Sequence, residues 1–222
     1  MNQDSTLWSD AWRRLLANKA AVAGGLVLLI FILLAIFAPW IAPHSYSYQN
    51  LELGASPPSS DFLLGTDTLG RDLFSRILYG ARVSLMVGFV ATGVALIIGV
   101  SWGIIAGYFG GKIDSVMMRI VDVLYGLPFI IFIILLMVIF GRNIWLLFGA
   151  IGAVEWLTMA RIVRGQVLTI KNQEYVLAAQ AMGVSNIQMF RKHIFPNILG
   201  PIAVYATLTI PQVMLLEAFL SF

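Results

Sequence analysis

Five long runs of the sequence are almost free of charge, and this pattern decides what the chain can fold into. Each run approaches or exceeds the roughly 20 residues that an α-helix needs to cross a bilayer. Two runs carry no charged residue, and the other three carry one acid each, Asp122, Glu155 or Glu217. With 59% hydrophobic and 11% charged residues, the chain has too little charge to solvate the surface of a soluble domain. We therefore predict an all-α polytopic membrane protein, with spans at 20–42, 83–111, 116–141, 144–161 and 197–222.

The chain lacks the residues that several other classes of protein require. The chain has no cysteine, which excludes disulfides, thiolate metal sites and a cysteine nucleophile. The nearest approach to a phosphate-binding loop, Gly111-Lys112, lacks both the first glycine and the following Ser or Thr. His44 and His193 fall on opposite sides of the membrane in the predicted topology. We expect no catalytic site, no metal and no cofactor on this chain, and its net charge of +3 gives no reason to expect nucleic acid.

Basic residues near the span ends predict the orientation, because they concentrate on the cytoplasmic side. They place a segment at 1–19 in the cytoplasm, a loop at 43–82 outside, and a segment at 162–196 in the cytoplasm. We expect a multi-pass inner membrane protein whose N-terminus is cytoplasmic. The basic residues that favour this orientation are Arg13, Arg14, Lys19, Lys112, Arg161, Arg164, Lys171, Arg191 and Lys192, whereas Arg71, Arg76 and Arg82 in the outer loop oppose it.

Three local features are predicted at or within the second and third spans. Apolar residues recur at helical spacing from Leu73, which predicts an amphipathic helix in the outer loop that leads into the second span. Arg119 and Asp122 lie three residues apart and are expected to pair on one helix face. Pro128 predicts a kink in the third span.

Small residues recur at every fourth position of the second span. Such a stripe allows the backbone of a neighbouring helix to approach closely. It is interpreted as tight packing in a helix bundle, or as a seam that moves during transport. The stripe comprises Ala91, Ala95, Gly99, Gly103, Gly107 and Gly111.

Two acids lie inside predicted spans. A carboxylate in mid-bilayer costs roughly 2.5 to 3.5 kcal/mol on insertion scales, so each is expected to face a cavity or a partner. Glu155 lies near the end of its span and is expected to pair with a nearby arginine, such as Arg161. Glu217 lies deeper, where it either lines a pathway or bonds to a partner helix.

The segment 174–196 is polar and helix-patterned, although it lies between two apolar spans. Good helix formers run from Glu174 to Met182, and Gly183 then favours helix termination. The alanines Ala178, Ala179 and Ala181 leave this helix narrow enough for its backbone to enter a groove on another protein. The alternative is an amphipathic hairpin that rests on the membrane surface.

A second helix is predicted directly after the glycine. Ser185 is placed at its N-cap with Gln188 as the reciprocal partner, and Val184 and Met189 are placed to form a hydrophobic staple. Pro196 is expected to stop the helix, because proline disfavours the helical conformation of the residue before it.

The same segment resembles the cytoplasmic signature of ABC importer permeases. Ala178, Ala179, Gly183 and Pro196 match the signature at the right spacing, and EYVLAAQAMG with HIFPN is similar to the form usual in the peptide branch. Leu177, His193 and Phe195 replace residues of the general signature. Further stretches agree, namely ANKAAVAGG, LGTDTLGRDLFSRILYGARVSL, ARIVRGQVL and LEAFLSF. The chain thus resembles the dipeptide/oligopeptide/nickel permease family, as the second permease of its pair.

The resemblance implies a type I ABC importer transmembrane domain with a permease core at 83–222. It also implies a heterodimer with a homologous permease, two cytoplasmic ABC ATPases that hold ATP and Mg, and an extracytoplasmic solute-binding protein. The family has six core spans, so five spans up to Phe222 imply a fragment or a prematurely ended product. The implied ATPase-docking residues are Glu174, Tyr175, Ala178, Ala179, Gly183, Ser185, Arg191, His193 and Pro196.

Peptides are the expected substrate, with nickel or another small solute as the alternative within the family. A gradient-driven transporter would need several buried acids in mid-span, where only Glu217 clearly qualifies. A membrane scaffold without transport is the third reading, since one span of the bundle would be lacking.

Overall fold

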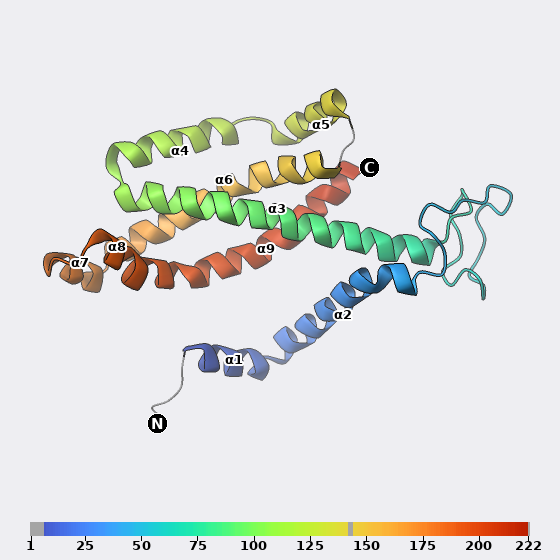
Figure 1. Cartoon of the computed structure of the whole chain (residues 1–222), viewed down its shortest axis with the longest axis horizontal. Coiled ribbons are helices and arrows are strands. Elements are labelled where there is room, and N and C mark those ends of the chain that lie inside the picture. The colour runs from blue at the N-terminus through green and yellow to red at the C-terminus, as the bar shows by residue number, and fades with distance from the viewer. Residues whose placement is uncertain (1–6, 142–143, 222) are drawn as a thin grey trace. The chain divides into compact units, whose positions relative to one another are not determined.

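The computed structural model describes residues 7–141 and 144–221, which are largely helical and include no β-strand. Contacts within the chain divide it into two units, one ending at Leu85 and the other starting at Met86. The elements, labelled in Figure 1, are α1 (Leu7–Ala17), α2 (Lys19–Ile41), α3 (Leu73–Phe109), α4 (Gly111–Tyr125), α5 (Phe129–Phe140), α6 (Ile144–Lys171), α7 (Glu174–Ala181), α8 (Asn186–Met189), the π-helical turn η1 (Phe190–Ile194) and α9 (Phe195–Ser221).

Three helical segments in the described ranges are long and apolar enough to cross a membrane, namely Lys19–Ile41, Leu73–Phe109 and Asn186–Leu220. The pair α4 and α5 makes a fourth span if the bent pair is counted as one. The remaining predicted span, 144–161, lies in α6, which also carries Glu155 and several basic residues. The amphipathic helix predicted from Leu73 and the second span form one continuous helix, α3.

The first unit contains a folded loop between α2 and α3. The Asn50 N–H donates to the Leu69 carbonyl at 3.2 Å, and the Thr66 N–H donates to the Ser56 carbonyl at 3.0 Å. Gly70 has φ +67, and a side chain there would collide with the Asn50 backbone, so this close crossing requires glycine. The polar, turn-rich composition of the loop is therefore compatible with a defined structure.

Two carboxylates hold the end of this loop. Asp67 accepts from the Arg71 and Leu69 N–H groups and from the Arg71 guanidinium, the last at 2.7 Å. Burial acts to raise the pKa of Asp67, but these hydrogen bonds outweigh it and lower the pKa below its usual value. Asp72 precedes α3 and accepts from the Ser75 N–H and hydroxyl, as an N-cap residue does. Burial again opposes the shift, and the bonds from Ser75 lower the pKa of Asp72.

In the second unit, α6 packs against both α3 and α9, and the three helices run alongside one another (Figure 1). A Cβ atom at Gly99 would lie 2.6 Å from the Met159 Cβ, and one at Gly103 would lie 2.5 Å from the Ala160 carbonyl oxygen. A Cβ at Gly107 would lie 2.9 Å from the Val167 Cβ. We call this contact, between Gly99, Gly103 and Gly107 on one side and α6 on the other, the glycine seam.

Gly111 does not belong to the glycine seam, which corrects the prediction for this residue. It lies beyond the end of α3 and has φ +55, and a Cβ atom at this position would meet no other atom within 4 Å. Gly110 also has positive φ, at +64, so two successive glycines reverse the chain between α3 and α4. The kink predicted at Pro128 is confirmed, because α4 ends at Tyr125 and α5 starts at Phe129 with a bend between them.

Candidate functional site

The α7–α8 hairpin, Glu174 to Met189, lies at one end of the second unit (Figure 1). Helix α7 ends at Ala181, and Gly183 follows with φ +79, the conformation that most favours glycine. The Gly183 N–H donates to the Gln180 carbonyl, and the Val184 N–H donates to the Ala179 carbonyl. The predicted break at Gly183 is confirmed.

The start of α8 is capped as predicted. The Ser185 hydroxyl accepts from the Gln188 N–H at 3.4 Å, and Val184 and Met189 both pack in the core beneath the hairpin. A cap of this kind contributes about 1 kcal/mol. Each fully buried Val, Ile or Met contributes about 1.5 to 3 kcal/mol, so the core dominates the stability of the hairpin.

That core joins the hairpin to the long helices. Val176 and Ala179 face inward from α7, and Val167 and Ile170 meet them from α6. Ala179 is only 4% exposed, so it faces the core and does not form part of the outward face proposed for the three alanines. Ala178 and Ala181 are exposed. The remaining buried members of this core are Met159, Val163, Met189, Ile194 and Ile198.

The helix stop predicted at Pro196 is wrong. The chain runs from α8 through the π-helical turn η1 directly into α9, and Pro196 lies in the first turn of α9. The Phe195 N–H donates to the Phe190 carbonyl, so the wider turn has already shifted the backbone hydrogen bonding where the proline, which has no N–H, enters the helix. Pro196 is exposed, and the half-buried His193 lies 6.2 Å from Tyr175 between ring centroids.

The outward face of the hairpin combines apolar and charged side chains. Met182 is 78% exposed and Ile187 is 74% exposed, values that are high for large apolar residues. Tyr175 and Leu177 are also exposed. Exposed residues of the predicted docking set are Glu174, Tyr175, Ala178, Gly183, Ser185, Arg191 and Pro196.

Lys171 and Tyr108 lie where the hairpin meets the end of α3. The Lys171 ammonium donates to the Tyr108 carbonyl at 2.7 Å and lies 5.8 Å from the centre of the Tyr108 ring. The Tyr108 hydroxyl donates to the Asn186 carbonyl at 3.2 Å. Neither Tyr108 nor Lys171 is predicted to be a site residue from the sequence, because their partners lie far away along the chain.

Two ion pairs join α4 to α6, and we call this contact the ion-pair seam. The Arg164 guanidinium donates to both oxygens of Asp114, at 2.5 and 2.6 Å. Arg161 donates to Asp122 at 2.7 Å and also lies over the Tyr125 ring, 4.2 Å from its centre. Arg161 and Arg164 thus hold α4 against α6.

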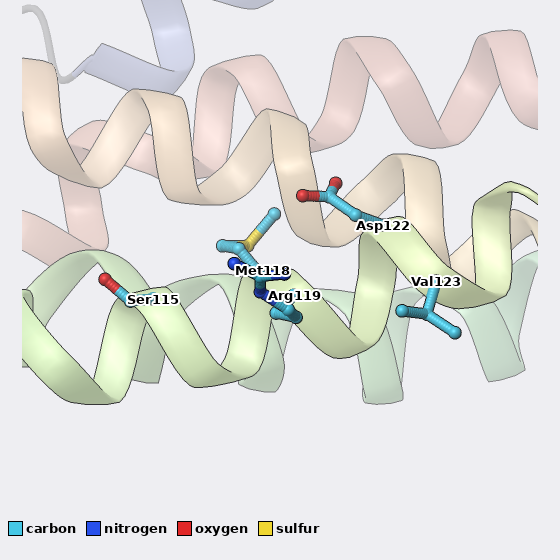
Figure 2. Close-up of a pocket in the computed structure, with 5 residues that line it drawn as sticks. All are labelled: Ser115, Met118, Arg119, Asp122 and Val123. Atoms are coloured by element: carbon cyan, nitrogen blue, oxygen red, sulfur yellow. The ribbon is translucent and has the colours of Figure 1, made fainter.

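The predicted pairing of Arg119 with Asp122 is wrong. Figure 2 shows Asp122 projecting from α4 towards the ribbon of α6, where Arg161 binds it. Arg119 makes no ion pair with any residue that the structure describes. Arg119 and Asp122 line an open cleft of about 450 Å³ along α4, together with Ser115, Met118 and Val123.

The two acids in the predicted spans are both buried. Glu155 is 7% exposed, and no ion pair to it occurs within 7–141 and 144–221, because Arg161 binds Asp122 instead. The expected arginine partner of Glu155 is therefore wrong. Glu217 is 8% exposed, so the chain itself covers most of this side chain.

Comparison with known proteins gives two matching family models. Residues 99–222 match the binding-protein-dependent transport system inner membrane component. Residues 6–58 match the N-terminal TM domain of oligopeptide transport permease C.

Curated relatives are similar to nearly the whole chain. The dipeptide transport system permease protein DppC of Bacillus subtilis is 50% identical over 96% of this chain and 67% of the relative. The oligopeptide transport system permease protein OppC of Bacillus subtilis is 46% identical, and that of Escherichia coli is 48% identical. Both matches cover 98% of this chain, and they cover 71% and 72% of the respective relatives.

These relatives are permease subunits, and the resemblance stated from the sequence is confirmed. The apolar helices and the family description together indicate a multi-pass inner membrane protein. The chain belongs to the family of binding-protein-dependent transport system inner membrane components, the transmembrane subunits of ABC importers.

Proposed function

We propose that this chain is a permease subunit that imports dipeptides or oligopeptides by alternating access, driven by ATP hydrolysis on partner subunits. The observation that carries the proposal is the α7–α8 hairpin, which rests on a buried core and presents an exposed apolar face. The substrate class is inferred from relatives whose names specify dipeptide and oligopeptide transport.

The hairpin is the proposed docking site for an ATPase. Large apolar side chains exposed to water are costly unless a partner covers them, and Met182 and Ile187 are the most exposed of this face. The close-packed residues behind them keep the hairpin from deforming when a partner binds and moves it. The same end of the second unit is therefore proposed to be cytoplasmic, in agreement with the basic residues Arg191 and Lys192.

The remaining subunits follow from this assignment. ATP and Mg would be bound by two ATPases, a homologous permease would complete the transmembrane pathway, and an extracytoplasmic binding protein would deliver the peptide. The glycine seam and the ion-pair seam would carry hairpin movement into the long helices.

Substitution of Gly183 by valine tests the docking assignment. A Cβ at this position meets no atom within 4 Å, but φ +79 disfavours any L side chain, and a β-branched one most of all. We expect Gly183→Val to distort the turn and to reduce co-purification of the ATPases by about tenfold, the effect of roughly 1.4 kcal/mol lost from binding, while the chain still inserts into the membrane.

Gly80→Val is the matched control. Gly80 lies inside α3 in an ordinary helical conformation and also has open space around its Cβ position. ATPase recovery should be the same as for the unsubstituted chain. Equal recovery with Gly183→Val would contradict the docking assignment.

A further inference from the structure

We propose that Tyr108 is a positioning residue that connects the α7–α8 hairpin to α3, so that movement of the hairpin reaches α3 as well as α6 and α9. This inference rests on the proposed function, since it concerns how hairpin movement is passed to the spans. It assigns a role in energy coupling to a residue outside the hairpin itself.

The chain connectivity leaves α3 without a direct covalent link to the hairpin, and the glycine seam joins α3 to α6 only. The hairpin follows α6 directly and continues through η1 into α9, so these two helices are covalently joined to it. Helix α3 ends at Phe109, and Tyr108 is separated from Asn186 by 78 positions in the sequence. Only noncovalent contacts can therefore make α3 follow the hairpin.

Tyr108 provides contacts to three elements. Its hydroxyl donates to the carbonyl of Asn186, the first residue of α8. Its own carbonyl accepts from Lys171, the last residue of α6. Its ring meets Phe190 of η1 at 6.4 Å in an edge-to-face arrangement. One residue near the end of α3 thus contacts α6, α8 and η1.

The contact with Lys171 provides a hydrogen-bond donor for a carbonyl at the C-terminal end of α3. The last carbonyls of a helix have no partner within the helix, and a cation near them is favoured by the helix dipole. Lys171 supplies both a donor and a positive charge at this place. The backbone of α3 is therefore held to the end of α6 independently of the Tyr108 hydroxyl.

Side chains fill the space between Tyr108 and the hairpin only in part. A cavity of about 170 Å³ lies beside it, lined by Tyr108, Phe109, Lys171, Val176, Gln180, Val184, Asn186, Met189 and Ile194. The Tyr108 ring still packs against the core of the hairpin, while its hydroxyl supplies the hydrogen bond to α8. Removal of the hydroxyl should therefore leave the fold intact while it loosens the link between α3 and α8.

The test is Tyr108→Phe in the complete complex of both permeases, two ATPases and the binding protein, reconstituted in proteoliposomes. Loss of one neutral hydrogen bond shifts an equilibrium about fivefold. We expect the ATP hydrolysed per peptide imported to rise by up to about fivefold, with ATPase co-purification unchanged. Tyr46→Phe is the matched control, because it removes an exposed tyrosine hydroxyl from the loop between α2 and α3 but keeps the ring beside Tyr79, and its ratio should not change.

The outcomes separate this inference from the proposed function. A ratio for Tyr108→Phe equal to that of the unsubstituted complex, with ATPases bound, would overturn the role of Tyr108 alone. Failure of the unsubstituted chain to bind ATPases would overturn the proposed function itself.

A distance measurement gives a readout that a merely structural role would not change. The chain has no cysteine, so spin labels can be placed uniquely at Ile105→Cys in α3 and Gln188→Cys in α8, both exposed. The distance between the labels should stay constant through the nucleotide cycle with Tyr108 and vary with Tyr108→Phe. The same distance behaviour in both proteins would contradict the link.

Discussion

Helix α6 is held to α3 and to α4 by two different kinds of contact. At the glycine seam the backbones approach so closely that a Cβ at Gly103 would overlap the Ala160 carbonyl oxygen. At the ion-pair seam, long arginine side chains reach Asp114 and Asp122 instead. Arg164 takes part in both, since its backbone lies against the glycines while its guanidinium binds Asp114.

The difference shows how one helix combines a fixed neighbour with an adjustable one. Close packing depends on shape, and a shift of a fraction of an ångström already loses contact energy or creates overlap. Ion pairs of partly exposed side chains tolerate small shifts, and salt weakens them. We therefore expect α3 and α6 to move together, and α4 to shift more easily against α6.

The largest effect is expected from Gly103→Val. The added side chain would overlap the α6 backbone, and overpacking of this kind costs about 3 kcal/mol or more. Thermal unfolding of the purified chain in detergent should show a strongly lowered midpoint. Gly93→Val, in the same helix but with no atom within 4 Å of its Cβ, is the control. Equal midpoints for both variants would contradict the seam.

A smaller and graded effect is expected at the ion-pair seam. The Asp114 side chain is 13% exposed and would be left without its cation, so Arg164→Met should cost about 2 kcal/mol. The Asp122 side chain is 65% exposed, so Arg161→Met should cost only about 0.5 kcal/mol. Measuring the free energy of unfolding of both variants at low and high salt would check which substitution costs more. A larger loss of stability for Arg161→Met would show that exposure of the acid does not determine the cost.

The smallest effect is expected from acid on the loop between α2 and α3, where charge-assisted hydrogen bonds form a third kind of contact. The pKa values of Asp67 and Asp72 are lowered from the usual 3.8. Their stabilisation is therefore complete well above that value and is lost as the pH falls through the lowered pKa values. Amide hydrogen exchange of residues 50–72 should accelerate only at such acidic pH. Asp67→Asn should accelerate it already at about neutral pH, where the native carboxylate is fully charged, and no change in that variant would contradict the assignment.

Local signals allow much of the hairpin to be predicted. Gly183 ends α7 and Ser185 caps α8, because both effects depend on the conformation and side chain of a single residue. The apolar runs likewise indicate the membrane helices, since the bilayer sets a minimum length. The glycine spacing indicates a close helix contact, although it does not identify α6 as the neighbour.

Long-range contacts account for the parts that could not be predicted. Asp122 binds Arg161 of another helix and not Arg119 on its own helix, because the partner helix brings a competing cation within reach. Ala179 faces the core since α6 and α9 lie on that side of α7. Tyr108 gives no sequence signal at all, as its partners are distant in sequence.

Helix α4 has a break in the backbone at each end, with two glycines of positive φ before it and the bend near Pro128 after it. A helix with a backbone break at each end can tilt without bending the helices that precede and follow it. Its charged contacts are with α6, and the Trp102 indole N–H of α3 donates to the Met117 carbonyl of α4 at 3.2 Å, so α4 is linked to both helices by side-chain contacts. This chain thus contains a short helix whose range of tilt is limited by the reach of two arginine side chains and one tryptophan.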